Sequence, residues 1–476
     1  MKIPVSPPPL HELVARVAAS PDGVRRYAHI FDLDGIGPAP GGEYRHWDTF
    51  RQVAPPAGHT VEEAWLAVKL ARQSLYRRLP LASASGKPFV YALPNPALEM
   101  LHRVDRDAGG SIRGEAQLEQ VTGTATRDTY LFKSLVEEAI TSSQLEGAST
   151  TRQVAKAMIQ EGRAPRDRSE RMIYNNYQAL LFVRRALDQS LTPEVVFELQ
   201  RILTEGTLDD PEAAGRFRRA DEHIVVSDEI GQTLHTPPPA SQLTARLRAM
   251  CDFANGDGGD FIPPAVRAVL LHFWLAYDHP FVDGNGRTAR ALFYWSMARH
   301  GYWLCEFVSI SRVLKRARAA YGRSFLYTET DGNDATYFIL HQLRVLLRAI
   351  DDLHEYLRRK SAELRAADDL VRRARWLRAE LNPRQLALVN HAMENQDALY
   401  TVESHRVSHG VSYETARSDL LALARAGLLE KRKRGRTFNF VVPADLKRRL
   451  QGRRPAATST SSTVGGATNR RGEPMP

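Results

Sequence analysis

The sequence HPFVDGNGRTAR, residues 279–290, lies between two predicted helices. Upstream, residues 265–277 are largely apolar and lack Pro and Gly, a pattern that predicts a buried helix. Downstream, residues 288–300 predict a second helix that stops at Gly301. The turn Gly284-Asn285-Gly286 therefore leads into a helix N-terminus, where converging backbone N–H groups and the helix dipole favour an anion. Phosphate is the anion we expect there.

The side chains of this stretch fit the same chemistry. Arg287 and Arg290 are three residues apart, so they are neighbours on one helical face and both can donate to a polyphosphate. Asp283 is a hard oxygen ligand suited to Mg2+, which takes one or two carboxylates together with substrate phosphates. His279 offers an imidazole that is neutral near pH 7 and can remove a proton from a hydroxyl. A base, a metal carboxylate and phosphate binders together indicate nucleotidyl or phosphoryl transfer.

Residues 279–290 resemble the signature of the Fic family, H-x-F-x-(D/E)-G-N-G-R-x-x-R, at every specified position. The resemblance implies transfer of AMP from ATP to a protein hydroxyl, with His279 as the base and Asp283 as the Mg2+ ligand. It also implies a set of phosphate binders, which are Gly284, Asn285, Gly286, Arg287 and Arg290. A subfamily that phosphorylates its target has Lys at the position of Gly286, so the glycine favours AMP transfer.

A second motif lies upstream in DTYLFKSLVEEAITSSQLEGAS, residues 128–149. We expect a helix over residues 130–147, with Gly147 as its stop. Ser142, Glu146 and Gly147 resemble the inhibitory motif of the Fic family, (S/T)-x-x-x-E-(G/N). The resemblance implies that Glu146 reaches Arg290 and occupies the place of the ATP γ-phosphate, since a carboxylate and a phosphate compete for one guanidinium group.

Residues 223–235 contain two short β-prone runs around Asp228-Glu-Ile-Gly, which predict a hairpin. In the Fic family a hairpin at this place is the flap that holds the target segment beside the signature. An exposed strand edge binds a peptide by backbone pairing with little demand on its sequence. Helices are expected at about 166–187 and at 193–205, the second capped by Thr192 with Pro193 at its first position.

Residues 1–120 form a leader without a catalytic constellation. Residues 60–79 predict an amphipathic helix with a capping box made by Thr60 and Glu63. Residues 27–32 predict a short strand. The aromatic residues of the leader, among them Trp65, are expected to pack in a core.

Residues 382–445 form a separate unit that resembles a winged helix-turn-helix domain, with three helices followed by two strands around a basic turn. A helical linker, residues 356–381, precedes it, and a low-complexity tail at 451–476 is expected to be disordered. Domains of this kind bind DNA or dock proteins, and the sequence leaves both open. The candidate DNA-binding residues are Arg417, Lys431, Arg432, Lys433, Arg434 and Arg436.

Composition sets further limits. The 476 residues carry a net charge of +10, which permits an acidic partner such as nucleic acid. Two cysteines cannot make a disulfide framework, so we expect a reducing, cytoplasmic compartment. No apolar run reaches the length of a membrane span, so no membrane partner is expected.

We therefore expect a mainly α-helical fold: a Fic-type core at 125–355 with a β-hairpin flap, plus a small winged-helix domain. The expected function is autoinhibited transfer of AMP from ATP, with Mg2+, to a Ser, Thr or Tyr hydroxyl of a protein target, with self-modification as one case. One alternative is removal of AMP, with Glu146 orienting a water. Another is a DNA-bound regulator whose core senses nucleotide. The long charged helix before residue 381 is also compatible with pairing to a second copy of the chain.

Overall fold

The computed structural model describes residues 1–31, 36–109, 131–256, 260–373, 381–434 and 437–452. They are mostly helical, and the chain forms two compact units, Met1–His354 and Glu355–Pro476. The predicted boundary near residue 120 falls outside the described residues. Residues 1–109 belong to the same compact unit as the signature. Within the described residues, no helix combines the length and the apolar character that a membrane crossing requires.

The leader begins the first unit and is mainly helical. Its elements are α1 (Leu10–Ala18), α2 (Gly23–Phe31), η1 (Pro40–Gly42), α3 (Trp47–Phe50), α4 (Val61–Gln73), β1 (Arg77–Ala82), β2 (Pro88–Tyr91) and α5 (Asn95–Ala108). The predicted capping box is confirmed, because Thr60 and Glu63 each accept from the other's backbone N–H. The predicted helix was too long, since α4 ends at Gln73 and β1 follows. The leader aromatics pack as expected, with Trp65 fully buried.

The prediction of a strand at residues 27–32 is wrong for residues 27–31, the part that the structure describes. These residues fall in α2, which places Ile30 in the leader core at 1% exposure. Tyr27 packs against the same core. The two side chains are three residues apart, so the helical spacing that puts them on one face decides the conformation.

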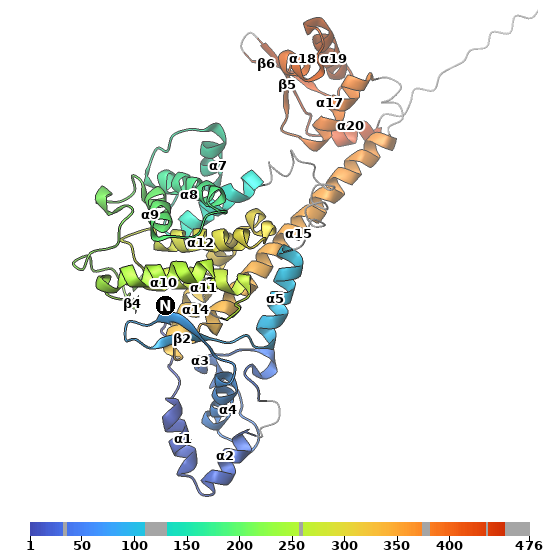
Figure 1. The fold of residues 1–476 in the computed structure, drawn as a ribbon. Coiled ribbons are helices and arrows are strands. Elements are labelled where there is room, and N and C mark those ends of the chain that lie inside the picture. Colours follow the sequence, from blue (N-terminus) through green and yellow to red (C-terminus); the bar gives the residue numbers. More distant parts are fainter. Residues whose placement is uncertain (32–35, 110–130, 257–259, 374–380, 435–436, 453–476) are drawn as a thin grey trace, which may run out of the picture. The chain divides into compact units, whose positions relative to one another are not determined.

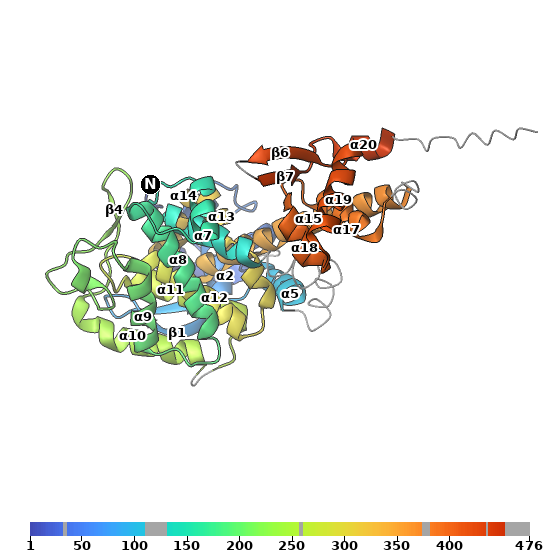
Figure 2. The ribbon, with the colours of Figure 1, turned by 90° about the horizontal axis from the view of Figure 1, so that it is seen from above.

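The rest of the first unit carries the signature. A helix over residues 131–145 comes first. Then follow α7 (Arg152–Glu161), α8 (Arg168–Arg185), α9 (Pro193–Thr204), η2 (Pro211–Ala213), β3 (Val226–Ser227), β4 (Thr233–His235), η3 (Ala240–Gln242), α10 (Leu243–Asn255), α11 (Pro264–Asp278), α12 (Asn285–Arg299), η4 (Trp303–Phe307), α13 (Ile310–Arg316), α14 (Arg318–Thr330) and α15 (Thr336–Arg373). Helices α11 and α12 lie side by side in the middle of this unit (Figure 1). Helices α8 and α9 pack against α12 (Figure 2).

Several predicted elements are confirmed here, with shifted ends. Strands β3 and β4 pair antiparallel, as the flap prediction requires. The helix predicted at 130–147 is helical over 131–145, and Gly147 follows it with φ 96°. The helix predicted from residue 288 begins at Asn285 instead, because Gly284 has the left-handed conformation, φ 85°, that starts it early. Residues 374–380 of the predicted helical linker lie outside the described residues.

The second unit contains α17 (Pro383–Glu394), β5 (Leu399–Thr401), α18 (Val402–His409), α19 (Tyr413–Arg425), β6 (Glu430–Arg434), β7 (Thr437–Val441) and α20 (Leu446–Gly452). The three predicted helices and the two-stranded hairpin are present, and β5 adds a third strand in the order β5-β7-β6. Leu420, Leu423 and Phe440 are among the residues of its own hydrophobic core. The predicted tail starts too early, because α20 extends to Gly452. Residues 453–476 lie outside the described residues.

Candidate active site

His279 follows the last residue of α11 with a left-handed backbone, φ 44° and ψ 55°. This conformation costs about 1–3 kcal/mol in a residue with a side chain. Arg218 stabilises the turn, because its Nε donates to the His279 carbonyl at 2.9 Å and its backbone N–H donates to the Pro280 carbonyl at 2.9 Å. The turn is therefore built to keep the imidazole in one place.

The His279 ring is half-buried, and its Nδ1 lies 3.3 Å from the Ala276 carbonyl. A carbonyl only accepts, so Nδ1 carries the hydrogen and Nε2 keeps a lone pair. Burial lowers the pKa of His279 to about 4, and the Ala276 carbonyl opposes this in part. The ring is thus a neutral imidazole at pH 7 with one nitrogen ready to accept a proton.

The signature loop is closed by one amide side chain. Asn285 Oδ1 accepts from the Phe281 N–H at 3.0 Å, and its Nδ2 donates to the Phe281 carbonyl at 2.8 Å. Gly284 is needed for space as well as for its positive φ, since a Cβ there would lie 2.9 Å from Thr204 Cγ2. Asn285 therefore shapes the loop through its side chain and lies buried beneath it.

Asp283 and Arg287 form an ion pair at the start of α12, with Arg287 Nη2 3.1 Å from Asp283 Oδ2. Arg287 is fully buried and also donates to the Leu203 carbonyl at 2.9 Å. Asp283 keeps 37% of its side chain exposed. The structure therefore separates the two signature arginines: Arg287 fixes the carboxylate, and the guanidinium of Arg290 is the one that faces the cavity described below.

Arg290 is bound by the upstream motif. Its Nε donates to Ser142 Oγ at 2.9 Å, and its Nη2 donates to the Ser142 carbonyl at 3.1 Å and to Glu146 Oε1 at 2.8 Å. Arg290 is 2% exposed, whereas the Glu146 side chain keeps 31%. Ser142 and Glu146 lie one helical turn apart, so a single face of the 131–145 helix and its C-terminal end supplies all three acceptors.

The Glu146 carboxylate lies in the anion site predicted from the glycines. A Cβ built on Gly286 would overlap Glu146 Oε1 and would come within 3.0 Å of Arg290 Nη1. The carboxylate thus lies against the first turn of α12, where the helix dipole and backbone N–H groups favour negative charge. Gly286 leaves room for the oxygen that occupies this place.

A cavity of about 230 Å³ adjoins these groups and brings most of them together. Its lining includes Glu146, His279, Gly286 and Arg290, and both strands of the hairpin contribute residues to it. One wall is formed by α14, with Tyr321 and Phe325. The site therefore combines a base, a guanidinium and an aromatic wall around one space. Asp283 and Gly284, in the loop before α12, and Asn285 and Arg287, in its first turn, do not line the cavity.

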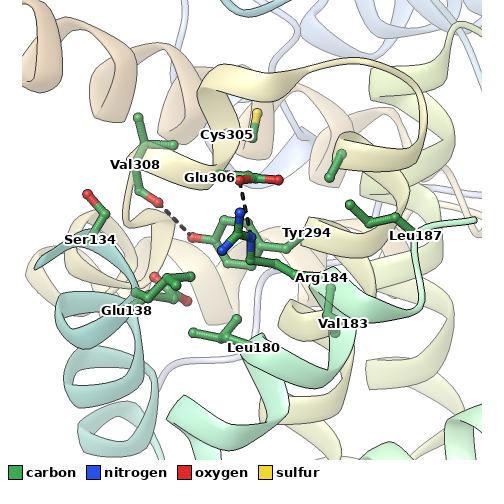
Figure 3. A pocket seen from close by; sticks show the side chains of 12 residues that line it. Ser134, Glu138, Leu180, Val183, Arg184, Leu187, Tyr294, Cys305, Glu306 and Val308 are labelled. Carbon is green, nitrogen blue, oxygen red and sulfur yellow. Dashed lines mark hydrogen bonds and ion pairs between the residues drawn. The ribbon is translucent and has the colours of Figure 1, made fainter. Parts of the chain in front are cut away.

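Another hollow, of about 20 Å³, has an almost wholly apolar lining and room for about one water (Figure 3). Tyr294 bonds to the Val308 carbonyl there at 3.2 Å, and Arg184 pairs with Glu306 at 3.3 Å. Glu138, on the 131–145 helix, accepts from Ser309 Oγ at 2.7 Å, and burial raises the pKa of this carboxyl. The Glu138 contact anchors the helix that leads to Glu146, and the hollow is too small for a nucleotide.

Several residues of the site were missed by the sequence analysis. Nothing in the sequence around Arg218 indicated that this residue would hold the turn at His279. His235 and Glu329 line the cavity from the flap and from α14, and they were assigned no role. Tyr321 could have been suspected as an aromatic residue soon after the signature. Its hydroxyl meets the buried His272 Nε2 at 2.8 Å.

In the second unit, the candidate DNA-binding residues are exposed where the structure describes their side chains. Arg417 lies 3.7 Å from Glu414, and Arg432 lies 3.1 Å from Glu430, so acidic neighbours offset part of their charge. Lys431 Nζ lies 3.8 Å from the centre of the Phe438 ring. Lys433 is exposed on β6. The side chain of Arg434 and all of Arg436 lie outside the described part of the chain.

Comparison with known proteins identifies the region around the cavity. Residues 190–297 match the sequence profile of the Fic/DOC family. This segment runs from α9 through the flap and the signature into α12. It contains His279, Asp283, Arg287 and Arg290, and the 131–145 helix lies outside it.

The curated relatives of this chain are named after an enzymatic activity. The chain is 30% identical over 167 residues to "Protein adenylyltransferase Fic" from Nematostella vectensis, which covers 34% of this chain and 37% of the relative. It is 27% identical over 224 residues to "Protein adenylyltransferase fic-1" from Caenorhabditis elegans, which covers 46% of this chain and 41% of the relative. The chain thus spans less than half the length of these relatives.

Solved structures give similar names. A Fic family protein from Desulfovibrio desulfuricans superposes with a TM-score of 0.47 at 16% identity, covering 73% of this chain and 94% of that one. A portion of Fic-1 from C. elegans superposes with a TM-score of 0.44 at 19% identity, covering 73% of this chain and 98% of that one.

Proposed function

We propose that this chain is a protein adenylyltransferase that moves AMP from ATP to a Ser, Thr or Tyr hydroxyl of a protein, copies of itself included. Glu146 holds it in an inhibited state. One observation carries the proposal: a carboxylate occupies the anion site formed by Gly286 and Arg290, in the cavity that also exposes the neutral His279. The names of the curated relatives agree with this activity.

One side of the cavity suits the base of a nucleotide and the other side suits its phosphates. Tyr321 and Phe325 offer aromatic faces on which a purine base can stack. The N-terminus of α12 and Arg290 favour the phosphates at the other side. The triphosphate chain would then extend toward the place that Glu146 occupies, so that ATP and the Glu146 carboxylate compete for Arg290.

The transfer needs one proton acceptor and one bond exchange. The target hydroxyl oxygen forms a bond to the α-phosphorus, the bond between the α-phosphorus and the bridging oxygen breaks, and pyrophosphate leaves with that electron pair. The hydroxyl proton goes to His279 Nε2, which is free because Nδ1 is turned to the Ala276 carbonyl. The products are the AMP ester of the target and pyrophosphate.

Asp283 fits a magnesium site. It is partly exposed and lies beside the anion site, and a single carboxylate with phosphate oxygens and waters suits Mg2+. Among the described residues there is no group of three or more His, Cys, Asp or Glu able to hold a metal by themselves, which agrees with an ion held jointly with a phosphate. Mg2+ would supply charge neutralisation at the phosphates. The ion pair with Arg287 Nη2, at 3.1 Å, limits the positions that the Asp283 carboxylate can take.

The test measures incorporation of α-labelled AMP into the protein itself and into lysate proteins. The Glu146→Gly protein should label and the Glu146→Gly, His279→Ala double variant should not, while both bind ATP. Labelling that survives in the double variant would remove His279 from the mechanism. Absence of labelling in both, with ATP bound, would argue for nucleotide sensing without transfer.

A second role is proposed for the second unit, as a winged-helix module that contacts nucleic acid phosphates. The order of α17, α18 and α19 before the β6–β7 hairpin supports it, as does the exposed Lys431 and Lys433 pair. A gel shift with duplex DNA at rising salt tests it. Replacing both lysines by Gln should weaken binding and flatten the dependence on salt. Equal binding by this variant would place the contact away from these two lysines, and no shift with the wild-type protein would contradict nucleic-acid binding.

A further inference from the structure

His235 connects three parts of the site. It ends flap strand β4, its Nε2 lies 2.7 Å from the Tyr277 carbonyl, and its Nδ1 lies 2.8 Å from Glu329 Oε2 on α14. Its ring also packs on the Tyr277 ring, with centroids 4.6 Å apart. Tyr277 is two residues before His279, so this histidine links the flap to both the base-bearing turn and the aromatic wall.

The hydrogen bonds fix how many protons the pair holds. The Tyr277 carbonyl only accepts, and an ionised Glu329 only accepts, so both ring nitrogens of His235 face acceptors. A neutral imidazole has one N–H and can satisfy one of them. The pair therefore needs one additional proton, which lies between Nδ1 and Oε2. The side chains of His235 and Glu329 are only 9% and 24% exposed, so water has little access to replace a missing partner.

We propose that His235 is a positioning residue that latches the flap to α14 through a proton shared with Glu329, and that loss of this proton releases β4. The proposal rests on the transferase function given above, because a released flap would hold its target segment less well. With the proton gone, the Nδ1 lone pair would face a carboxylate oxygen at 2.8 Å. The two would repel, and the contact would open.

The other charged groups around His235 come mainly from α11 and the turn after it. Asp278 and His279 both sense the charge of His235. Asp278 is already bound by Arg246 and by Trp274 Nε1, the latter at 3.0 Å, so it is not a competing partner. His279 is neutral, as shown above. Glu329 on α14 is thus the carboxylate that faces the His235 ring directly.

The latch predicts that the conservative substitution Glu329→Gln keeps the flap in place. In Glu329→Gln, a neutral His235 can donate from Nε2 to Tyr277 and accept at Nδ1 from the new amide. The flap should then stay latched without the shared proton. In His235→Ala, the flap should be released at every pH. The control is His223→Ala, which changes an exposed histidine before the flap.

The experiment is hydrogen–deuterium exchange of a peptide spanning residues 226–235 in the full-length protein, between pH 6 and pH 8.5, corrected for the intrinsic exchange rate. In wild type and His223→Ala, protection should fall about tenfold as pH rises, the effect of losing one charge-assisted hydrogen bond. Glu329→Gln should show no such fall, and His235→Ala should be unprotected throughout. Protection that is independent of pH in wild type, or that falls equally in Glu329→Gln, would overturn the latch.

Self-labelling with AMP in the Glu146→Gly background separates the latch from the proposed function. Labelling at saturating ATP should fall at high pH with His235 and Glu329 intact, and the fall should disappear with Glu329→Gln. No labelling at any pH, together with the exchange pattern above, would contradict the transferase and leave the latch standing. Labelling with no change between the two proteins would contradict the latch alone.

Discussion

Glu146 Oε1 accepts a hydrogen bond from Arg290 Nη2 at 2.8 Å, although 144 residues separate the two in sequence. The same guanidinium is bound by Ser142 through both its hydroxyl and its backbone carbonyl. Arg290 is therefore occupied on two of its nitrogens by a segment that lies outside the Fic/DOC match. In the proposed function, a ligand that binds Arg290 Nη2 competes with Glu146 for it.

Removing the Glu146 carboxylate should activate the enzyme. If the inhibited state exceeds the open state by about 100:1, Glu146→Gly releases about 2.7 kcal/mol and raises AMP transfer up to about a hundredfold. Labelled-AMP incorporation and thermal melting measure the two effects. The matched control is Glu137→Gln on the same helix, whose carboxylate pairs with Arg152 at 2.7 Å. Equal activation by both variants would assign the effect to a loosened helix.

Charge reversal at the other partner should have the opposite consequence. Arg290→Glu also breaks the pair with Glu146, but it removes the phosphate contact and places a carboxylate in an anion site. AMP transfer should fall below the wild-type rate, and ATP affinity should fall with it. A variant that is well folded and more active than wild type would show that Arg290 serves only the inhibited state.

The Glu146–Arg290 contact was predicted from the resemblance of both motifs to the Fic family, and local spacing accounts only for the helical faces on which the two side chains lie. Ser142 and Glu146 lie one turn apart, and the glycines determine where α12 begins. The phosphate-binding role of Arg287 stays a prediction, and its three-residue spacing from Arg290 did not indicate that its side chain is buried against the Leu203 carbonyl. Arg218, His235 and Glu329 reach the site from separate segments through tertiary contacts, which no local pattern encodes.

The pH dependence of transfer should reflect the low pKa of His279. An imidazole with an ordinary pKa would be about nine-tenths protonated at pH 5.5. Because burial lowers the pKa of His279 to about 4, it stays mostly neutral there and remains a base. Single-turnover labelling from pH 5 to 8, in the Glu146→Gly, Glu329→Gln protein, should show no loss near pH 6.5. A loss centred there would mean that His279 is solvated in the active state.

Substitutions of Asp283 and of Arg287 should differ in their effects on AMP transfer and on the free energy of unfolding. Asp283→Asn keeps the shape of a partly exposed side chain but removes the charge that pairs with Arg287, so the melting temperature should fall by less than in Arg287→Met while the Mg2+ requirement of transfer rises. Arg287→Met removes a buried cation and leaves the Leu203 carbonyl and Asp283 without their partner. This should cost about 3–5 kcal/mol of unfolding free energy. Equal stability of the two variants would place Arg287 outside the buried framework.

The leader should be required for activity, since its hairpin supports the helix that ends at the base. Phe89 on β2 is fully buried, with its ring centre 4.9 Å from that of Tyr277 and 5.4 Å from that of Phe273. Both partners lie on α11, and Tyr277 also holds His235. Phe89→Ala should lower the unfolding free energy by about 3–5 kcal/mol. It should also reduce AMP transfer at temperatures where the protein is still folded, because the cavity left behind allows the end of α11 to move.

The matched control is Phe261→Ala, which removes a ring that is 75% exposed and should change neither property. Denaturant melts and labelling of both variants in the Glu146→Gly background measure the two effects. A folded and fully active Phe89→Ala protein would show that the leader packs on the catalytic unit without supporting it.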